Sequence, residues 1–145
     1  MLRTVSGDVF VERIGSAATS SGDFLVHGAL RSRDGRCLKS YQVLALGRAP
    51  DRNRAESVVR VIADTLRSPT AATSAAVRVP DGWRTVIRRG EGRRAMVRWG
   101  LYRPDPSGRS DHPDAPGMDP LIVGEAPSPA AARTLLSRVL PLLAC

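Results

Sequence analysis

Apolar residues recur at helical spacing in two stretches of the chain, and the first of these follows Pro50. Asn53 is expected to cap this helix, with Glu56 three residues later as its capping-box partner. The helix should end at Ser68, because the Pro69 that follows disfavours helical geometry in the residue before it. The positions expected on its buried face are Ala55, Val58, Val59, Ile62 and Leu66.

The second helical stretch begins at Ser128, a residue type that caps helices, and Pro129 then suits the first helical position. Pro141 is expected to end this helix, since a proline removes a hydrogen bond from a helix interior. The positions expected on its buried face are Ala132, Leu135, Leu136, Val139 and Leu140. Both stretches therefore predict surface helices with one apolar side.

The remaining apolar positions form short or alternating runs that are typical of β-strands. Strands are expected before the first helix over residues 9–14, 24–31 and 38–46, the last two joined by a turn at 33–36. Before the second helix they are expected over residues 83–89, 94–103 and 120–123, with a turn at 91–92 and a short extra strand at 76–79. The order of three strands and a helix thus occurs twice.

Two pairs of segments indicate that this order is an internal repeat. Residues 46–51 (LGRAPD) align with residues 123–128 (VGEAPS), and in that register the buried faces of the two helices superpose. Residues 24–31 (FLVHGALR) align with residues 96–103 (MVRWGLYR), five positions out of the first register. A duplication is the preferred interpretation, and convergent patterning of two similar units is the alternative.

The sequence therefore predicts an α+β protein of two β-β-β-α units, with unit one at residues 1–70, a linker at 71–75 and unit two at 76–145. At roughly 70 residues, neither unit can bury much surface alone. We expect the two to pack as a single domain over residues 1–145, with antiparallel sheets that are each covered by one helix.

This element order resembles the duplicated single-strand-binding folds of the Whirly and PUR type. One unit, in which Gly-x-Ala-Pro-[Asp/Ser] leads into a helix that contains alanine, is also similar to the three-stranded DNA-binding modules of AP2 and integrase arm-binding domains. The resemblance implies a nucleic-acid-binding fold, and it carries no site residue over to this chain.

The charge of the chain agrees with a polyanionic partner. Its 22 basic residues outnumber 14 acidic ones, which gives a net charge of +8, and Lys39 is the one lysine among 21 arginines. Cations near phosphates release condensed counterions, so the balance favours nucleic acid. The alternative is that the arginines reflect the codon usage of a GC-rich genome and affect solubility alone.

The densest basic cluster is the predicted hairpin of residues 83–103. Its apolar positions alternate with arginines, so one face should pack on the helix while the other carries guanidinium groups. The residues expected to bind nucleic acid there are Arg84, Arg88, Arg89, Arg94, Arg98 and Arg103, with Trp83 and Tyr102 as stacking partners. The alternative is a solvated sheet face without a ligand.

Residues 104–120 contain five prolines and four aspartates and are expected to form a mobile loop, since they offer little apolar surface to bury. A divalent metal at Asp111, His112 and Asp114 is a minor alternative. No metal site and no cofactor is predicted.

No catalytic motif is evident, so an enzyme is not the preferred interpretation. His27 is expected to be a packed histidine, and an order of Glu12, Asp23 and Lys39 that matches some metal nucleases is a minor alternative. Cys37 and Cys145 are too far apart for a disulfide framework. With no signal peptide and no apolar run of membrane-spanning length, a cytoplasmic location without membrane contact is expected.

The sequence thus predicts a small, basic, non-catalytic protein that binds nucleic acid of unknown type through an arginine-rich sheet face. The alternative is a structural or protein-interaction component: a homo-oligomer such as a homodimer, a phage or mobile-element protein, or a chaperone-like adaptor. A continuous arginine patch would favour the first. Arginines that pair with Asp and Glu beside an exposed apolar strip would favour the second.

Overall fold

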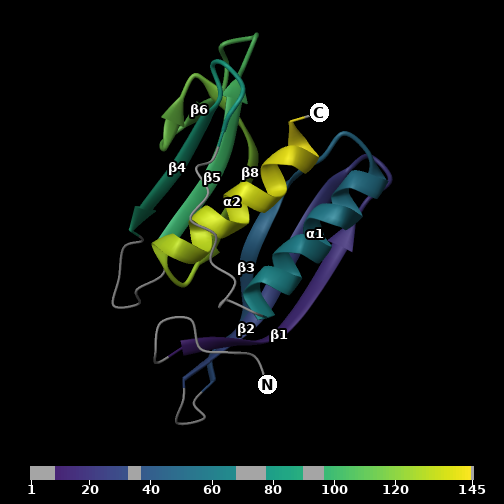
Figure 1. The fold of residues 1–145 in the computed structure, drawn as a ribbon, viewed down its shortest axis with the longest axis vertical. Coiled ribbons are helices and arrows are strands. Elements are labelled where there is room, and N and C mark those ends of the chain that lie inside the picture. The colour runs from purple at the N-terminus through teal and green to yellow at the C-terminus, as the bar shows by residue number, and fades with distance from the viewer. Residues whose placement is uncertain (1–8, 33–36, 68–77, 90–96, 145) are drawn as a thin grey trace.

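A six-stranded antiparallel sheet and two helices make up the α+β fold (Figure 1). The computed structural model describes residues 9–32, 37–67, 78–89 and 97–144. The sheet order is β1-β2-β3-β8-β5-β4, and a separate two-stranded hairpin consists of β6 and β7. The elements are β1 (Val9–Ala18), β2 (Asp23–Ser32), β3 (Cys37–Arg48), α1 (Arg52–Arg67), β4 (Arg84–Arg89), β5 (Val97–Pro104), β6 (Asp111–His112), β7 (Ala115–Pro116), β8 (Met118–Ala126) and α2 (Pro129–Leu143).

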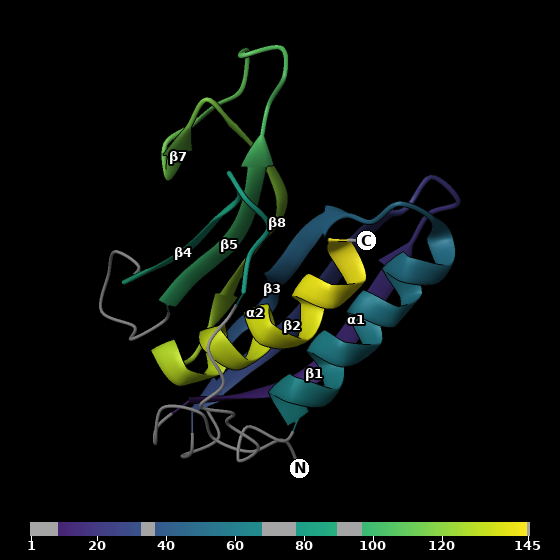
Figure 2. The ribbon, with the colours of Figure 1, turned by 45° about the horizontal axis from the view of Figure 1, so that its top comes forward.

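Both helices lie side by side on one face of the sheet (Figures 1 and 2). Helix α1 packs on β1 and β2, whereas α2 packs on β4, β5 and β8. The core lies between the helices and this inner face of the sheet. We call the opposite face, which no helix covers, the outer face.

The buried faces of both helices are those that the apolar spacing predicts. Their shared positions are at most 8% exposed: Ala55, Val58, Val59, Ile62 and Leu66 in α1, and Ala132, Leu135, Leu136, Val139 and Leu140 in α2. Ser128 caps α2 as expected, because its hydroxyl accepts a hydrogen bond from the Ala131 amide at 3.1 Å. The helix faces are therefore confirmed.

Two predicted helix boundaries are wrong. Asp51, and not Asn53, caps α1, since its Oδ1 accepts a hydrogen bond from the Arg54 amide at 2.8 Å. Glu56 pairs instead with Arg52, one helical turn earlier. Helix α2 continues through Pro141 to Leu143, where apolar contacts of the last turn with the core outweigh the hydrogen bond that the proline removes.

The six main predicted strands are present, and most are longer than expected, but they form one sheet and not two. Strands β3 and β8 join the halves through three residue pairs: Ala45 with Gly124, Leu46 with Val123, and Gly47 with Ile122. We call this junction the seam. The turns at 33–36 and 91–92, the linker at 71–75 and residues 76–77 lie outside the described residues, and Arg78 and Val79 are not in a strand.

Glycines allow the strands to approach closely at the seam. A Cβ atom on Gly124 would lie 2.3 Å from the Leu44 carbonyl oxygen and 2.9 Å from the Trp99 ring, and one on Gly47 would lie 2.8 Å from the Phe24 ring. Trp99 and Phe24 therefore cover the two glycines on the inner face, each from the strand that pairs with it. Trp99 is fully buried, and its indole nitrogen has no hydrogen-bond partner among the described residues.

The two halves share a strand order outward from the seam, β3-β2-β1 and β8-β5-β4. The upstream residue match is nevertheless not kept. It equates His27 with Trp99, yet Phe24 lies opposite Gly47 where Trp99 lies opposite Gly124. His27 is half-buried, and its ring lies against Gly15 of β1. A common origin of the two units therefore stays a prediction.

The seam generates a first prediction. Gly124→Ala should lower the free energy of unfolding by about 3 kcal/mol, because the new methyl group overlaps backbone that cannot shift without separating β3 from β8. Urea unfolding measures this change. Gly108→Ala is the control: its Cβ meets nothing within 4 Å, so it should cost about 1 kcal/mol from its positive φ angle. Equal stabilities for the two variants would contradict the close approach.

Candidate functional site

An apolar strip runs across the middle of the outer face. Leu25 of β2 lies opposite Leu46 of β3, which in turn lies opposite Val123 of β8. Val43 precedes Leu46 on the same strand, β3. Four large apolar side chains are exposed among the described residues, and three of them belong to this strip: Leu25 at 36%, Val43 at 45% and Leu46 at 48%. We call Leu25, Val43, Leu46 and Val123 the apolar strip.

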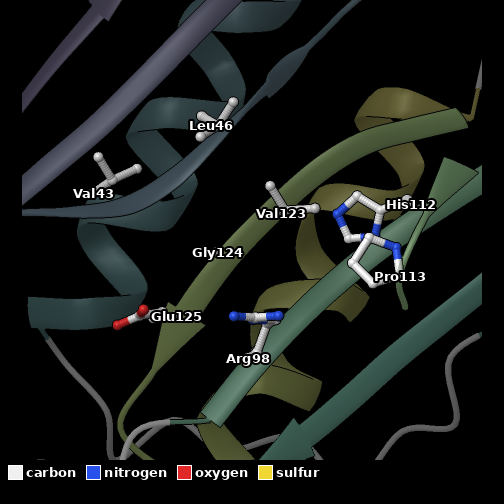
Figure 3. Close-up of a pocket in the computed structure, with 8 residues that line it drawn as sticks. All are labelled: Val43, Leu46, Arg98, His112, Pro113, Val123, Gly124 and Glu125. Carbon is white, nitrogen blue, oxygen red and sulfur yellow. The ribbon is translucent and has the colours of Figure 1, made fainter. Parts of the chain in front are cut away.

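Two shallow hollows meet at Leu46 and Val123. The first, of about 330 Å³, is bounded by Val43, Leu46 and Val123 on one side and by His112 and Pro113 on the other, with Arg98 and Glu125 at one end (Figure 3). The second, of about 390 Å³, continues past Leu46 toward the ion pairs Arg48–Asp23 and Arg103–Asp119. Together they form a groove over the seam whose three arginines and three carboxylates balance.

The predicted basic cluster is divided between the two faces. Register places Arg84 opposite Tyr102 and Arg88 opposite Arg98, and all four lie on the side of the sheet that forms the outer face. Arg89 lies opposite the buried Val97 and so belongs to the inner side. Arg103 pairs with Asp119 at 3.3 Å, and Arg94 lies outside the described residues. The described arginines of the cluster therefore do not all lie on one face.

Of the two expected aromatic partners, Tyr102 is too buried to stack on a base, whereas Trp83 keeps part of its surface exposed. Tyr102 is 1% exposed, with its ring over Gly100, and Trp83 is partly buried against the core. Of the predicted alternation, Val97, Trp99 and Leu101 face the core and Arg98 faces outward as expected.

The sequence interpretation named Asp114 only as a possible metal ligand and missed its pairing with the arginines. Its side chain is fully buried, and its Oδ1 lies 2.5 Å from Nη1 of Arg88 while its Oδ2 lies 3.5 Å from Nη1 of Arg98. Both arginine side chains are about half exposed. Asp114 Oδ2 has no hydrogen-bond partner among the described residues. We call Arg88, Arg98 and Asp114 the clasp.

The clasp holds a hairpin against the outer face. Residues 110–117, here called the flap, contain β6 and β7, and the Gly117 amide closes their base by donating to the Ser110 carbonyl at 3.0 Å. Ala115 is fully buried, and the His112 ring lies 5.0 Å from the Tyr102 ring. Residues 104–120 therefore do bury apolar surface, contrary to the expectation, although their mobility stays a prediction.

A tight turn leads into the flap. Asp105 accepts hydrogen bonds from the hydroxyl and amide of Ser107 and from the amide of Ser110. These bonds hold the pKa of Asp105 well below its usual range, and the bond from the Ser107 hydroxyl has the largest effect. The Asp105 carboxylate therefore stays ionised and keeps the turn hydrogen-bonded at ordinary pH.

Burial beneath the flap also changes Tyr102. Desolvation is the main cause that raises the pKa of Tyr102 to about 12, and the charge of Asp114 adds to it, while Arg98 and Arg88 act in the opposite direction. Tyr102 thus stays neutral well above the pH at which an exposed tyrosine ionises.

Neither the alternative of a metal site in the flap nor that of a metal nuclease gains support. Asp114 is engaged with the arginines, and His112 Nδ1 accepts a hydrogen bond from the Asp114 amide at 3.2 Å. Within the described ranges no group of three His, Cys, Asp or Glu residues could hold a metal ion. Asp23 pairs with Arg48. The described part of the chain does not include Cys145 or the side chains of Glu12, Cys37, Lys39 and Asp111.

Among the described residues, no helix is long and apolar enough to cross a bilayer.

The comparisons with known proteins add no relative: no protein-family model matches the chain, and neither the curated proteins nor the solved structures give a match.

One sequence signal could have revealed the apolar strip. Residues 24–26 (FLV) and 43–46 (VLAL) are apolar at consecutive positions, so both faces of these strands carry apolar side chains. A strand with one solvated face alternates instead. No such signal could have revealed the clasp, because a long loop separates Asp114 from Arg88 and Arg98 in the sequence and folds back to bring them together.

Removing the flap tests whether it stabilises the fold. Replacing residues 110–117 by a short Gly-Ser link should lower the Tm by at least about 5 °C, because Ala115 is lost and Tyr102 becomes exposed. Differential scanning calorimetry measures the shift. A Tm that matches the parent would support the expectation of a loop with little buried surface.

The raised pKa of Tyr102 predicts a loss of stability at alkaline pH. Between pH 10, where the unfolded tyrosine ionises, and about pH 12, the folded state keeps a proton that the unfolded state has released, so stability falls as pH rises. Tyr102→Phe should remove this contribution. Chemical unfolding of both proteins across this pH window measures the slopes, and identical slopes would contradict the buried environment of Tyr102.

Proposed function

We propose that this chain is a non-catalytic interaction protein that associates with a second copy of itself through the apolar strip of the outer face. The observation that supports the proposal is the location of exposed apolar side chains. Leu25, Val43 and Leu46 gather over the central strands, where a monomer would gain by placing polar residues.

Charge favours a second copy as the occupant. Two chains that each carry +8 repel one another over most of their surfaces. The groove over the seam differs, because Arg48, Arg98 and Arg103 are matched in number by Asp23, Asp119 and Glu125. Two such faces can meet without net repulsion, and each supplies both signs of charge at the rim of an apolar centre.

The pairing of arginines argues in the same direction. Arg88 and Arg98 face the buried Asp114, and Arg103 faces Asp119, so these three arginines are paired with carboxylates of their own chain. An interface that already satisfies its charges loses less on desolvation than one with unpaired arginines.

Nucleic-acid binding through the same arginines is the second candidate. It is supported by the net charge of +8 and by the side-chain exposure of about half at Arg88 and Arg98. The closeness of Asp114 weakens it, since a carboxylate between two guanidinium groups opposes the approach of a phosphate.

A single substitution tests self-association. Leu46→Glu should convert a dimer into a monomer, because it places a charge at the point where the two hollows meet. Sedimentation equilibrium over a range of protein concentrations measures the change. Val79→Glu is the matched control: Val79 is 37% exposed but lines neither hollow, so this variant should dimerise like the parent. A parent chain that is monomeric at every concentration would contradict the proposal.

A further inference from the structure

Arg88 and Arg98 are placed so that an anion must lie between them. They are directly opposite each other on antiparallel strands β4 and β5, and they share the outer face. Like charges at directly opposed positions destabilise a sheet unless a counter-charge intervenes. Asp114 supplies that counter-charge from the flap, far along the chain.

Asp114 compensates the charges of the two arginines incompletely. Its Oδ1 accepts a hydrogen bond from Arg88 at 2.5 Å, but its Oδ2 is 3.5 Å from Arg98 and has no hydrogen-bond partner among the described residues. A planar carboxylate thus serves one guanidinium well and the other poorly. A phosphate group has more acceptor oxygens in a tetrahedral arrangement and could bond to both.

The arginines are accessible from solvent while Asp114 is not. Their side chains are 48% and 50% exposed, whereas that of Asp114 is 0% exposed. A ligand can therefore reach both guanidinium groups from outside, and it would displace the carboxylate by moving the flap. Glu125, opposite Arg98 on β8, is a further carboxylate near the site, and it accepts a hydrogen bond from Gln42.

The flap is constructed in a way that permits such a movement. Strands β6 and β7 have two residues each, and a glycine with a positive φ angle follows β7 at Gly117. Another, Gly108, lies in the turn that leads into the flap. Glycine absorbs backbone rotation at little cost, so the flap can move as a unit.

We propose that Arg88 and Arg98 form a phosphate-binding site which Asp114 occupies in the closed state, so that the flap is an intramolecular competitor of the ligand. The site takes a phosphate group, either free or as part of a nucleic acid. The site uses no residue of the apolar strip, but Arg98 also lines the groove that the proposed dimer covers, so a bound phosphate and a second copy compete at that residue.

Isothermal titration with inorganic phosphate tests the site. Asp114→Asn keeps the shape of the side chain and removes its charge, and it should raise the affinity for phosphate by about tenfold or more, since the internal competitor is lost. Asp119→Asn is the matched control: it removes the carboxylate of the neighbouring ion pair with Arg103 and should bind phosphate like the parent. Adding Arg88→Gln and Arg98→Gln to Asp114→Asn should abolish the gain.

Two results would overturn the proposal: a folded Asp114→Asn variant that binds phosphate no more tightly than the parent, or a gain that survives loss of both arginines. A parallel arm with single-stranded oligothymidylate shows the source of the phosphate. Tighter binding of the oligonucleotide as well as of free phosphate identifies a nucleic-acid site, and tighter binding of free phosphate alone identifies a small-anion site; both support the clasp.

The parent protein gives an independent measurement in case Asp114→Asn fails to fold. Phosphate should accelerate amide hydrogen exchange at His112, Asp114 and Ala115 relative to chloride at the same ionic strength, because the ligand displaces Asp114 and opens the flap. Unchanged exchange at a phosphate concentration that saturates binding would overturn the proposal.

Discussion

The pairing of β3 with β8 is the constraint on which the rest of the structure depends. It involves three residue pairs, yet it turns two sets of three strands into one sheet and thereby places both helices on the same face. Gly47 and Gly124 allow this approach, and the rings of Phe24 and Trp99 fill the space that the missing side chains leave on the inner face. The cost includes a buried indole nitrogen without a partner among the described residues, which is worth about 1–3 kcal/mol.

The same pairing gives the outer face its character. Because β3 and β8 are central strands, Leu46 and Val123 lie in the middle of a broad surface and not at an edge. Charged residues surround this centre as opposite pairs, and the flap covers one end of it. The outer face therefore combines an open apolar part with a basic part that the flap covers incompletely.

Local patterns in the sequence predicted local structure well. Helical spacing identified the buried faces of α1 and α2, because burial of an apolar side is nearly the whole reason for their formation. The cap of α1 was predicted wrongly, since Asp51 and Asn53 are equally suited residue types and only the structure shows that Asp51 accepts the hydrogen bond. The joining of two sheets into one, the burial of Tyr102 and the engagement of Arg88 by Asp114 all depend on residues distant in sequence, which no periodicity reports.

The seam has a consequence for the order of folding. The pairs β1–β2, β2–β3 and β4–β5 join strands that follow one another, so they close short stretches of chain and can form early. The seam instead joins residues roughly 80 positions apart. Each half can therefore form its own strands first, and we expect the pairing of β3 with β8 to form late in folding.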